Sequence, residues 1–269
     1  MRGAIVSSKV AIVKFDDGDV QQAFQQAHKL IGGIDDLNTK KRTAVIKPGV
    51  FHHKKKNHPT LDVLNAIING FSKAPQIFVV ESDNYKGTGS ERLQIWKEAY
   101  TNRVVPFNLS EDTDTRGVKI ADENIGLSHI LFKPNVFVST HVLRKTEYGS
   151  VLKNLMGLMP TPKKGRFHKQ LPRVLIDAYE AIGGIDLAVI DGTHAYATVS
   201  LDKGIKTNTL IVGRDAVAVD AVGATIMGVK LQKMPILQEA IRRGLGEGDI
   251  DKIQVLGTST ESVREELRR

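Results

Sequence analysis

Short apolar runs alternate with polar, helix-patterned segments along most of the chain. Five of these runs end on a polar or ionisable residue: TAVIK at Lys47, IFVVESD at Glu81 and Asp83, VFVSTH at His141, LAVID at Asp191 and TLIVGRD at Asp215. Continuous apolar runs of this length are typical of strands that are buried on both faces of a parallel sheet. Open parallel sheets bind ligands just beyond the carboxyl ends of their strands. We therefore expect the five polar endings to converge on one site.

Helical spacing recurs between the apolar runs. HPTLDVLNAIINGF, SERLQIWKEAY and LPRVLIDAYEAIGG place apolar residues at intervals of three and four. Alternating strands and helices predict an α/β fold with a largely parallel, doubly wound sheet, in a single domain spanning residues 1–269. The more polar residues 103–128 are expected to form a small insertion or an edge hairpin. Residues 160–169, rich in Pro, Gly and basic side chains, are expected to form a mobile basic loop.

Composition limits the chemistry. The chain contains no cysteine, so it can form no disulfide and no internal iron–sulfur cluster. Its formal net charge of +8 favours anionic partners; the alternative is that the positive charge is spread over the surface without forming a binding patch. No apolar run approaches the roughly 20 residues of a membrane helix, and the first residues lack a signal-peptide pattern. We therefore expect a cytoplasmic protein without membrane contact.

Basic side chains near the strand ends predict anion binding. Lys47 is followed by the loop HHKKKNH, whose lysines would repel a divalent cation; a solvated basic loop is the alternative. Lys153 and Asn154 lie among small and apolar residues, where a buried lysine needs a negative partner. A negative ligand or a strand-end carboxylate would meet that need. We expect Lys47, Lys153 and Asn154 to bind a substrate carboxylate or phosphate.

Acidic side chains at the strand ends predict a cation site or acid–base chemistry. Glu81 and Asp83 are two residues apart and point the same way from an extended strand, although Asp83 could instead accept hydrogen bonds from loop amides. Asp191 is followed by His194, and this pair suits metal coordination or proton transfer; capping of its own turn is the alternative for Asp191. Glu81, Asp83, Asp191 and His194 are the predicted ligands of a divalent metal ion whose identity is unknown.

Three residues are predicted to be catalytic: His141, Lys145 and Asp191. His141 and Lys145 would share a face if the segment after the strand is helical, so that a neutral histidine acts as base while the lysine holds an anion. A capping or salt-bridge role is the alternative for this pair. Asp215 is predicted to cap the following helix. Asp220 needs a partner because it stands in the apolar stretch AVAVDAVGA.

An ordered set of motifs resembles the domain-of-unknown-function 362 family. The set comprises KPG at Lys47, VVESD at Glu81, STHVLRKTEYGSVLKNLMG from Ser139, His168, VIDGTH at Asp191, GRDAVAVDAVGATIMG at Gly213 and GLG at Gly244. The resemblance implies an α/β domain common in archaea and bacteria, often found beside ferredoxin-type iron–sulfur modules, and without an assigned reaction for most members. It also adds His168 to the expected substrate-binding residues.

The chain departs from the family pattern in three places. It lacks every cysteine, so a redox role would require a separate ferredoxin-type partner. Its KPG has no asparagine after the proline, and the loop after Asp191 has no Gly-Pro element. These departures affect the loops that would contact a substrate.

The leading interpretation is an enzyme that acts on a small carboxylate or phosphate, with or without a metal, at the carboxyl ends of the strands. One alternative is a nucleic-acid-binding protein that uses HHKKKNH and PTPKKGRFHK, although aromatic residues make up only 6% of the chain and give little support for base stacking. Another alternative is an accessory subunit of a redox assembly. Nucleotide-binding glycine motifs and a GxSxG nucleophile elbow are absent.

Overall fold

The computed structural model describes residues 8–161, 163–197 and 204–268. The strands are β1 (Lys9–Lys14), β2 (Thr43–Pro48), β3 (Ile77–Glu81), β4 (Val104–Asn108), β5 (Thr115–Ile120), β6 (Glu123–Ser128), β7 (Asn135–Arg144), β8 (Leu187–Tyr196), β9 (Ile205–Gly213) and β10 (Gln254–Gly257). The α-helices are α1 (Val20–Leu30), α2 (Leu61–Gly70), α3 (Gly89–Leu93), α4 (Leu171–Ala181), α5 (Ala216–Ile226), α6 (Pro235–Arg242) and α7 (Thr260–Glu266). The 3-10 helices are η1 (Gln94–Ala99), η2 (His129–Leu131), η3 (Lys153–Leu158), η4 (Lys164–Gln170), η5 (Leu231–Lys233) and η6 (Ile250–Lys252).

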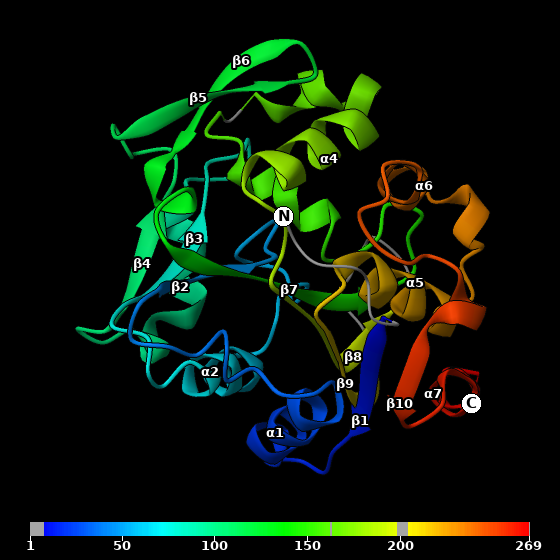
Figure 1. The fold of residues 1–269 in the computed structure, drawn as a ribbon. Coiled ribbons are helices and arrows are strands. Elements are labelled where there is room, and N and C mark those ends of the chain that lie inside the picture. Colours follow the sequence, from blue (N-terminus) through cyan, green and yellow to red (C-terminus); the bar gives the residue numbers. More distant parts are fainter. Residues whose placement is uncertain (1–7, 162, 198–203, 269) are drawn as a thin grey trace.

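Eight strands form one twisted sheet in the order β10-β1-β9-β8-β7-β2-β3-β4 (Figure 1). The pairs from β8 through β7, β2 and β3 to β4 are all parallel. Only β9 runs against its neighbours β8 and β1 within the described sheet. The central strands are buried on both faces, which is why they appear in the sequence as continuous apolar runs.

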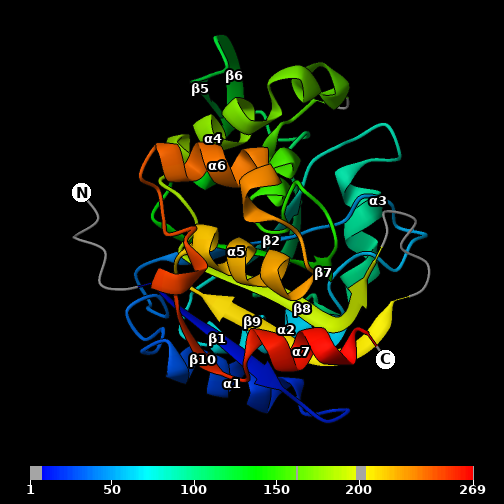
Figure 2. The ribbon, with the colours of Figure 1, turned by 90° about the vertical axis from the view of Figure 1, so that its right-hand side faces the viewer.

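Helices cover both faces of the sheet and divide the core into two layers. The helices α1 and α2 pack on one face, while α4, α5 and α6 cover the other, as Figure 2 shows. Phe24 of α1 and Ile67 of α2 belong to the first layer, and Leu175 of α4 and Val222 of α5 belong to the second. The doubly wound α/β architecture expected from the alternating pattern is confirmed.

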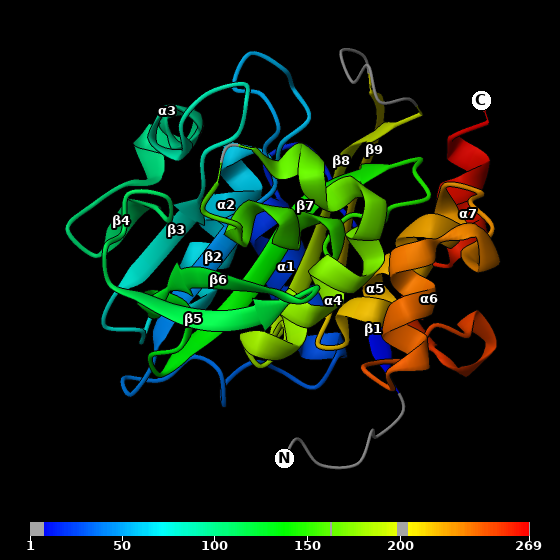
Figure 3. The ribbon, with the colours of Figure 1, turned by 90° about the horizontal axis from the view of Figure 1, so that it is seen from above.

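The polar residues 103–128 supply an edge strand and a separate hairpin. β4 continues the main sheet beside β3, whereas β5 and β6 pair with each other in an antiparallel ribbon. This ribbon lies over the same face as α4 (Figure 3), and Asp177 of α4 accepts a hydrogen bond from the Ala121 N–H at 2.7 Å. The small hairpin expected for this segment is therefore present.

The direction of β9 separates one of the five polar strand endings from the others. Because β9 is antiparallel to β8, its carboxyl end lies at the opposite edge of the sheet. Asp215 caps α5 there, accepting hydrogen bonds from Val217 N at 2.9 Å and Ala218 N at 3.1 Å. The helix cap is confirmed, and the expectation that all five endings converge is wrong for Asp215.

Residues 160–169, expected to be a mobile basic loop, contain the start of η4. Lys164 is buried at the beginning of this 3-10 helix, whereas Lys163 and Arg166 are exposed. The segment therefore delivers one basic side chain to the interior. In the described part of the chain, no helix combines the length and the apolar character that a membrane crossing needs.

Candidate functional site

The carboxyl ends of β2, β3, β7 and β8 lie at one edge of the sheet because these strands are parallel neighbours. Lys47 and Glu81 lie at the ends of β2 and β3, whereas β7 and β8 continue beyond His141 and Asp191, which the strand register places near the same level of the sheet. All four side chains are buried. Charged groups removed from water need compensating partners. The identity of those partners decides which side chains remain available to a ligand.

Lys47 and Glu81 form a buried ion pair. Lys47 Nζ lies 2.8 Å from Glu81 Oε2 and also donates to the Pro48 carbonyl oxygen at 2.9 Å and to Asn154 Oδ1 at 3.0 Å. Asn154 Nδ2 donates in return to the Lys47 carbonyl oxygen at 2.6 Å and to Ser139 Oγ at 3.0 Å. Burial lowers the pKa of Lys47, and Glu81 opposes that lowering. A lysine ammonium has three donors, so in this arrangement Lys47 has none left for a ligand.

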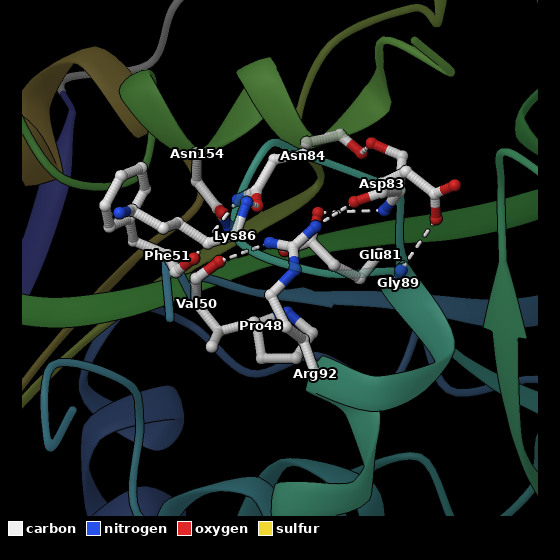
Figure 4. Close-up of polar contacts among 12 residues, drawn as sticks. Pro48, Val50, Phe51, Glu81, Asp83, Asn84, Lys86, Gly89, Arg92 and Asn154 are labelled. Atoms are coloured by element: carbon white, nitrogen blue, oxygen red, sulfur yellow. Dashed lines mark hydrogen bonds and ion pairs between the residues drawn. The ribbon is translucent and has the colours of Figure 1, made fainter. Parts of the chain in front are cut away.

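Arg92 of α3 is a second cation on the same carboxylate (Figure 4). Its Nη1 lies 3.4 Å from Glu81 Oε2 and donates to the Val50 carbonyl oxygen at 2.7 Å. Its Nη2 donates to the Ser82 carbonyl oxygen. The remaining Glu81 oxygen, Oε1, accepts from Ser82 N at 2.9 Å. The buried Glu81 carboxylate therefore compensates the charges of two buried cations, Lys47 and Arg92.

Lys164 brings a further cation to this cluster from η4. Its Nζ donates to Ser82 Oγ at 2.6 Å, and Ser82 Oγ donates to the Gly157 carbonyl oxygen at 2.6 Å. Burial lowers the pKa of Lys164 to about 7, and Glu81 opposes this shift. The ammonium is therefore partly deprotonated near neutral pH.

The helix η3 packs directly against the Lys47–Glu81 ion pair at Gly157. A Cβ atom on Gly157 would lie 2.2 Å from Lys47 Cε and 2.6 Å from Glu81 Oε1. Carbon atoms do not approach side chains that closely without displacing them. Any larger residue would therefore push η3 away from Lys47 and Glu81.

Asp220 positions the turn that precedes η3. Its carboxylate accepts hydrogen bonds from the N–H groups of Ser150, Val151 and Leu152, at 2.9, 3.0 and 3.0 Å. Gly149 begins this turn with a φ of 76°, and a Cβ there would lie 2.5 Å from Asp220 Oδ2. We expected Asp220 to need a partner, and its partners are the backbone N–H groups just before Lys153 and Asn154.

His141 is buried and neutral. Burial, followed by the charges of Arg144 and Lys47, lowers its pKa well below the usual value. Its Nδ1 accepts a hydrogen bond from Val142 N at 2.7 Å, which assigns the proton to Nε2. No described residue is hydrogen-bonded to Nε2. The ring lies against Gly49, where a Cβ would be 2.2 Å from His141 Cδ2.

Two more cations stand beside His141 with little compensation. Arg144 donates from Nη2 to the Gly149 carbonyl oxygen at 3.3 Å, but its buried Nε has no partner among the described residues. Burial lowers the pKa of Arg144 to about 10, with Asp220 opposing. Burial and the neighbouring Arg144 lower the pKa of Lys153 to about 8. In the described part of the chain, Lys153 Nζ has neither a hydrogen-bond nor an ion-pair partner.

The other predicted acidic residues accept hydrogen bonds from backbone N–H groups and, for Asp83, from one side chain. Asp191 accepts from Thr60 N through Oδ2 at 2.7 Å and from Thr193 N through Oδ1 at 2.8 Å. The first of these bonds ties β8 to the residue that caps α2. Asp83 Oδ1 accepts from Gly89 N at 2.8 Å and from Asn108 Nδ2 at 2.9 Å. Both carboxylates thus hold loops at the carboxyl edge of the sheet.

Three predicted residues lie outside the buried cluster. Lys145 is exposed, because β7 continues as a strand through Arg144 and the helix that would have placed Lys145 beside His141 is not formed. His168 is exposed on η4 and its Nδ1 lies 3.1 Å from the Gly165 carbonyl oxygen. His194 pairs with Lys206 across the β8–β9 ladder.

The predicted metal ligands Glu81, Asp83, Asp191 and His194 do not converge in this arrangement. Across residues 8–161, 163–197 and 204–268, no group of three or more His, Asp or Glu side chains is placed to hold an ion. Both oxygens of Glu81 and of Asp191 already accept protein hydrogen bonds. Metal binding stays a prediction.

The sequence pattern did not indicate Arg92, Arg144 or Lys164. Arg92 precedes the buried Trp96 by four residues, and this helical spacing was the one signal that it faces inward. Nothing in the basic segment distinguishes Lys164 from the exposed Lys163 beside it. Burial of Arg92 and Lys164 depends on how α3 and η4 pack over the strand ends, which sequence spacing does not encode.

Comparison with known families gives one match. A family model described as "Domain of unknown function (DUF362)" matches residues 45–225, which include β2, β3, β7 and β8 and the buried cluster at their ends. A search of curated proteins found no match.

Proposed function

Because the chain belongs to the DUF362 family, which is defined by a domain of unknown function, we propose its activity from the chemistry of the site itself. The protein acts as an enzyme on a small molecule that carries a carboxylate or a phosphate. The substrate binds at the carboxyl ends of β2, β7 and β8, next to His141.

The observation that carries this proposal is the uncompensated positive charge of Lys153. The side chain is largely buried, it has no partner in the described part of the chain, and Arg144 stands beside it. Burying two like charges together is costly unless an anion compensates them. A bound carboxylate or phosphate would accept from Lys153 and from the unpaired Nε of Arg144.

His141 gives the site a chemical function beyond charge. Its neutral ring carries the proton on Nε2, and the lowered pKa keeps it neutral at physiological pH. A neutral N–H donor stabilises negative charge that develops on a substrate oxygen without adding a further cation. This changes the role expected from the sequence, because His141 in this tautomer is a donor rather than a base.

Sulfate tests the anion site because its charge is constant across the relevant pH range. We expect calorimetry to show sulfate binding to the wild-type protein, with affinity falling up to about tenfold between pH 7 and pH 9 as Lys153 loses its proton. Lys153→Met should bind weakly at every pH. Lys97→Met, which removes an exposed lysine on η1, is the matched control and should behave like the wild type.

The enzymatic part of the proposal is tested by conversion. Carboxylate and phosphate metabolites are incubated with the protein and followed by nuclear magnetic resonance, and both Lys153→Met and His141→Asn should abolish any turnover found. Absence of sulfate binding would remove the anion site. Binding without conversion of any compound would instead leave a binding protein rather than an enzyme.

A further inference from the structure

A cavity lies between the end of α5, the helix α7, the carboxyl ends of β7 and β8 and the start of β9. Its volume is about 260 Å³. Drug-sized ligands occupy about 300–1,000 Å³, so this space suits a smaller metabolite. None of its lining residues belongs to the clusters around Lys47 and His141.

The cavity combines basic side chains with an apolar wall. Lys145, Arg264 and Arg268 line it together with Ile205, Ile226 and Leu267. No acidic side chain lines it among the described residues. Neither Lys145 nor Arg268 has an ion-pair partner in the part of the chain that the structure describes. Within the described residues, these two positive charges therefore have no internal anion.

Arg264 has a structural role as well. Its guanidinium lies beside Gly228, just past the end of α5, where a cation interacts favourably with the negative end of the helix dipole. It also acts electrostatically on Glu261 of its own helix. Lys145 and Arg268, rather than Arg264, are therefore the charges available to a ligand.

We propose that this cavity is a second binding site, for a small organic anion with a short apolar body. The carboxylate or phosphate would be held by Lys145 and Arg268, and the hydrocarbon part would lie against Ile205, Ile226 and Leu267. This arrangement gives Lys145, which the sequence assigned to catalysis, a role away from His141. This second site is independent of the anion site beside Lys153.

Hexanoate is a suitable probe because it carries one carboxylate on a short chain. Titration of the ¹⁵N-labelled 269-residue protein should shift the amide signals of Ala195, Ile226, Met227 and Gly228, which surround the cavity. Lys145→Gln and Arg268→Gln should each weaken binding about fivefold, as expected for exposed charges. Both side chains are exposed, so the variants should fold normally.

Three comparisons make the test decisive. Lys97→Gln should leave hexanoate affinity unchanged, and Lys153→Met should do the same while it removes sulfate binding at the other site. The neutral 1-hexanol should bind at least about fivefold more weakly than hexanoate. The proposal is overturned if hexanoate does not shift the cavity amides, if 1-hexanol binds equally well, or if neither glutamine variant weakens binding.

Discussion

Each buried charge in this protein is compensated to a different degree by its immediate neighbours. Lys47 has three acceptors for its three protons, whereas Lys153 has none among the described residues. The sequence placed both lysines in apolar surroundings and could not distinguish them. They differ because only one side chain of the adjacent residues Lys153 and Asn154 contacts the Lys47–Glu81 ion pair. Asn154 is the one that joins this ion pair, through Lys47 Nζ. A saturated lysine supports the fold, and an unsaturated one is free to bind.

Glu81 should contribute more to stability than an ordinary acidic residue. Glu81→Gln would leave Lys47 and Arg92 buried without a carboxylate, and we expect the free energy of unfolding to fall by about 3–5 kcal/mol. Adding Lys47→Met to this variant should cost less than the sum of the two single changes, because the pair is coupled. Urea denaturation measures all three variants.

The exposed Glu98 provides the control for this cycle. Glu98→Gln should change the free energy of unfolding by no more than about 0.5 kcal/mol. Strict additivity of the Glu81 and Lys47 effects would contradict the coupling inferred from their 2.8 Å contact.

At the scale of elements, the strands could be predicted but their directions could not. Continuous apolar runs identified β2, β3, β7, β8 and β9, because each is buried on both faces. The same pattern fits a parallel and an antiparallel neighbour, so nothing in TLIVGRD showed that β9 turns Asp215 to the opposite edge. The short helices η3 and η4 carry Asn154 and Lys164 to the ion pairs, yet both are shorter than the roughly 11–18 residues over which helical periodicity can be recognised in a sequence.

Gly157 should be essential for the close approach of η3 to the sheet. We expect Gly157→Ala to lower the free energy of unfolding by about 1–3 kcal/mol, because its Cβ would overlap Lys47 Cε. Gly165→Ala is the matched control, since no atom lies within 4 Å of a Cβ at that position. Thermal denaturation distinguishes them; equal melting temperatures would show that η3 can shift without cost.

For the whole molecule, the net charge of +8 does not show that several basic groups are buried, where the loss of hydration disfavours their charged form. Lys47, Lys153 and Lys164 all have pKa values lowered by burial. Composition gave the sign of the net charge but not its distribution between surface and core. The internal cations imply a pH dependence of stability that a basic surface alone would not produce.

Lys164 provides the sharpest test of that pH dependence. Its pKa is about 7 in the folded protein and 10.5 in an unperturbed lysine, so between these values the unfolded chain binds more protons than the folded one. Stability must therefore rise with pH across this window and fall as the pH is lowered toward 7. Relative to Lys164→Met, the wild-type free energy of unfolding should increase by about 2 kcal/mol between pH 7 and pH 9, as measured by urea denaturation. Lys163→Met removes the exposed neighbouring lysine and should retain the wild-type slope of unfolding free energy against pH. Identical slopes for the wild type and Lys164→Met would mean that Lys164 titrates as a solvated lysine.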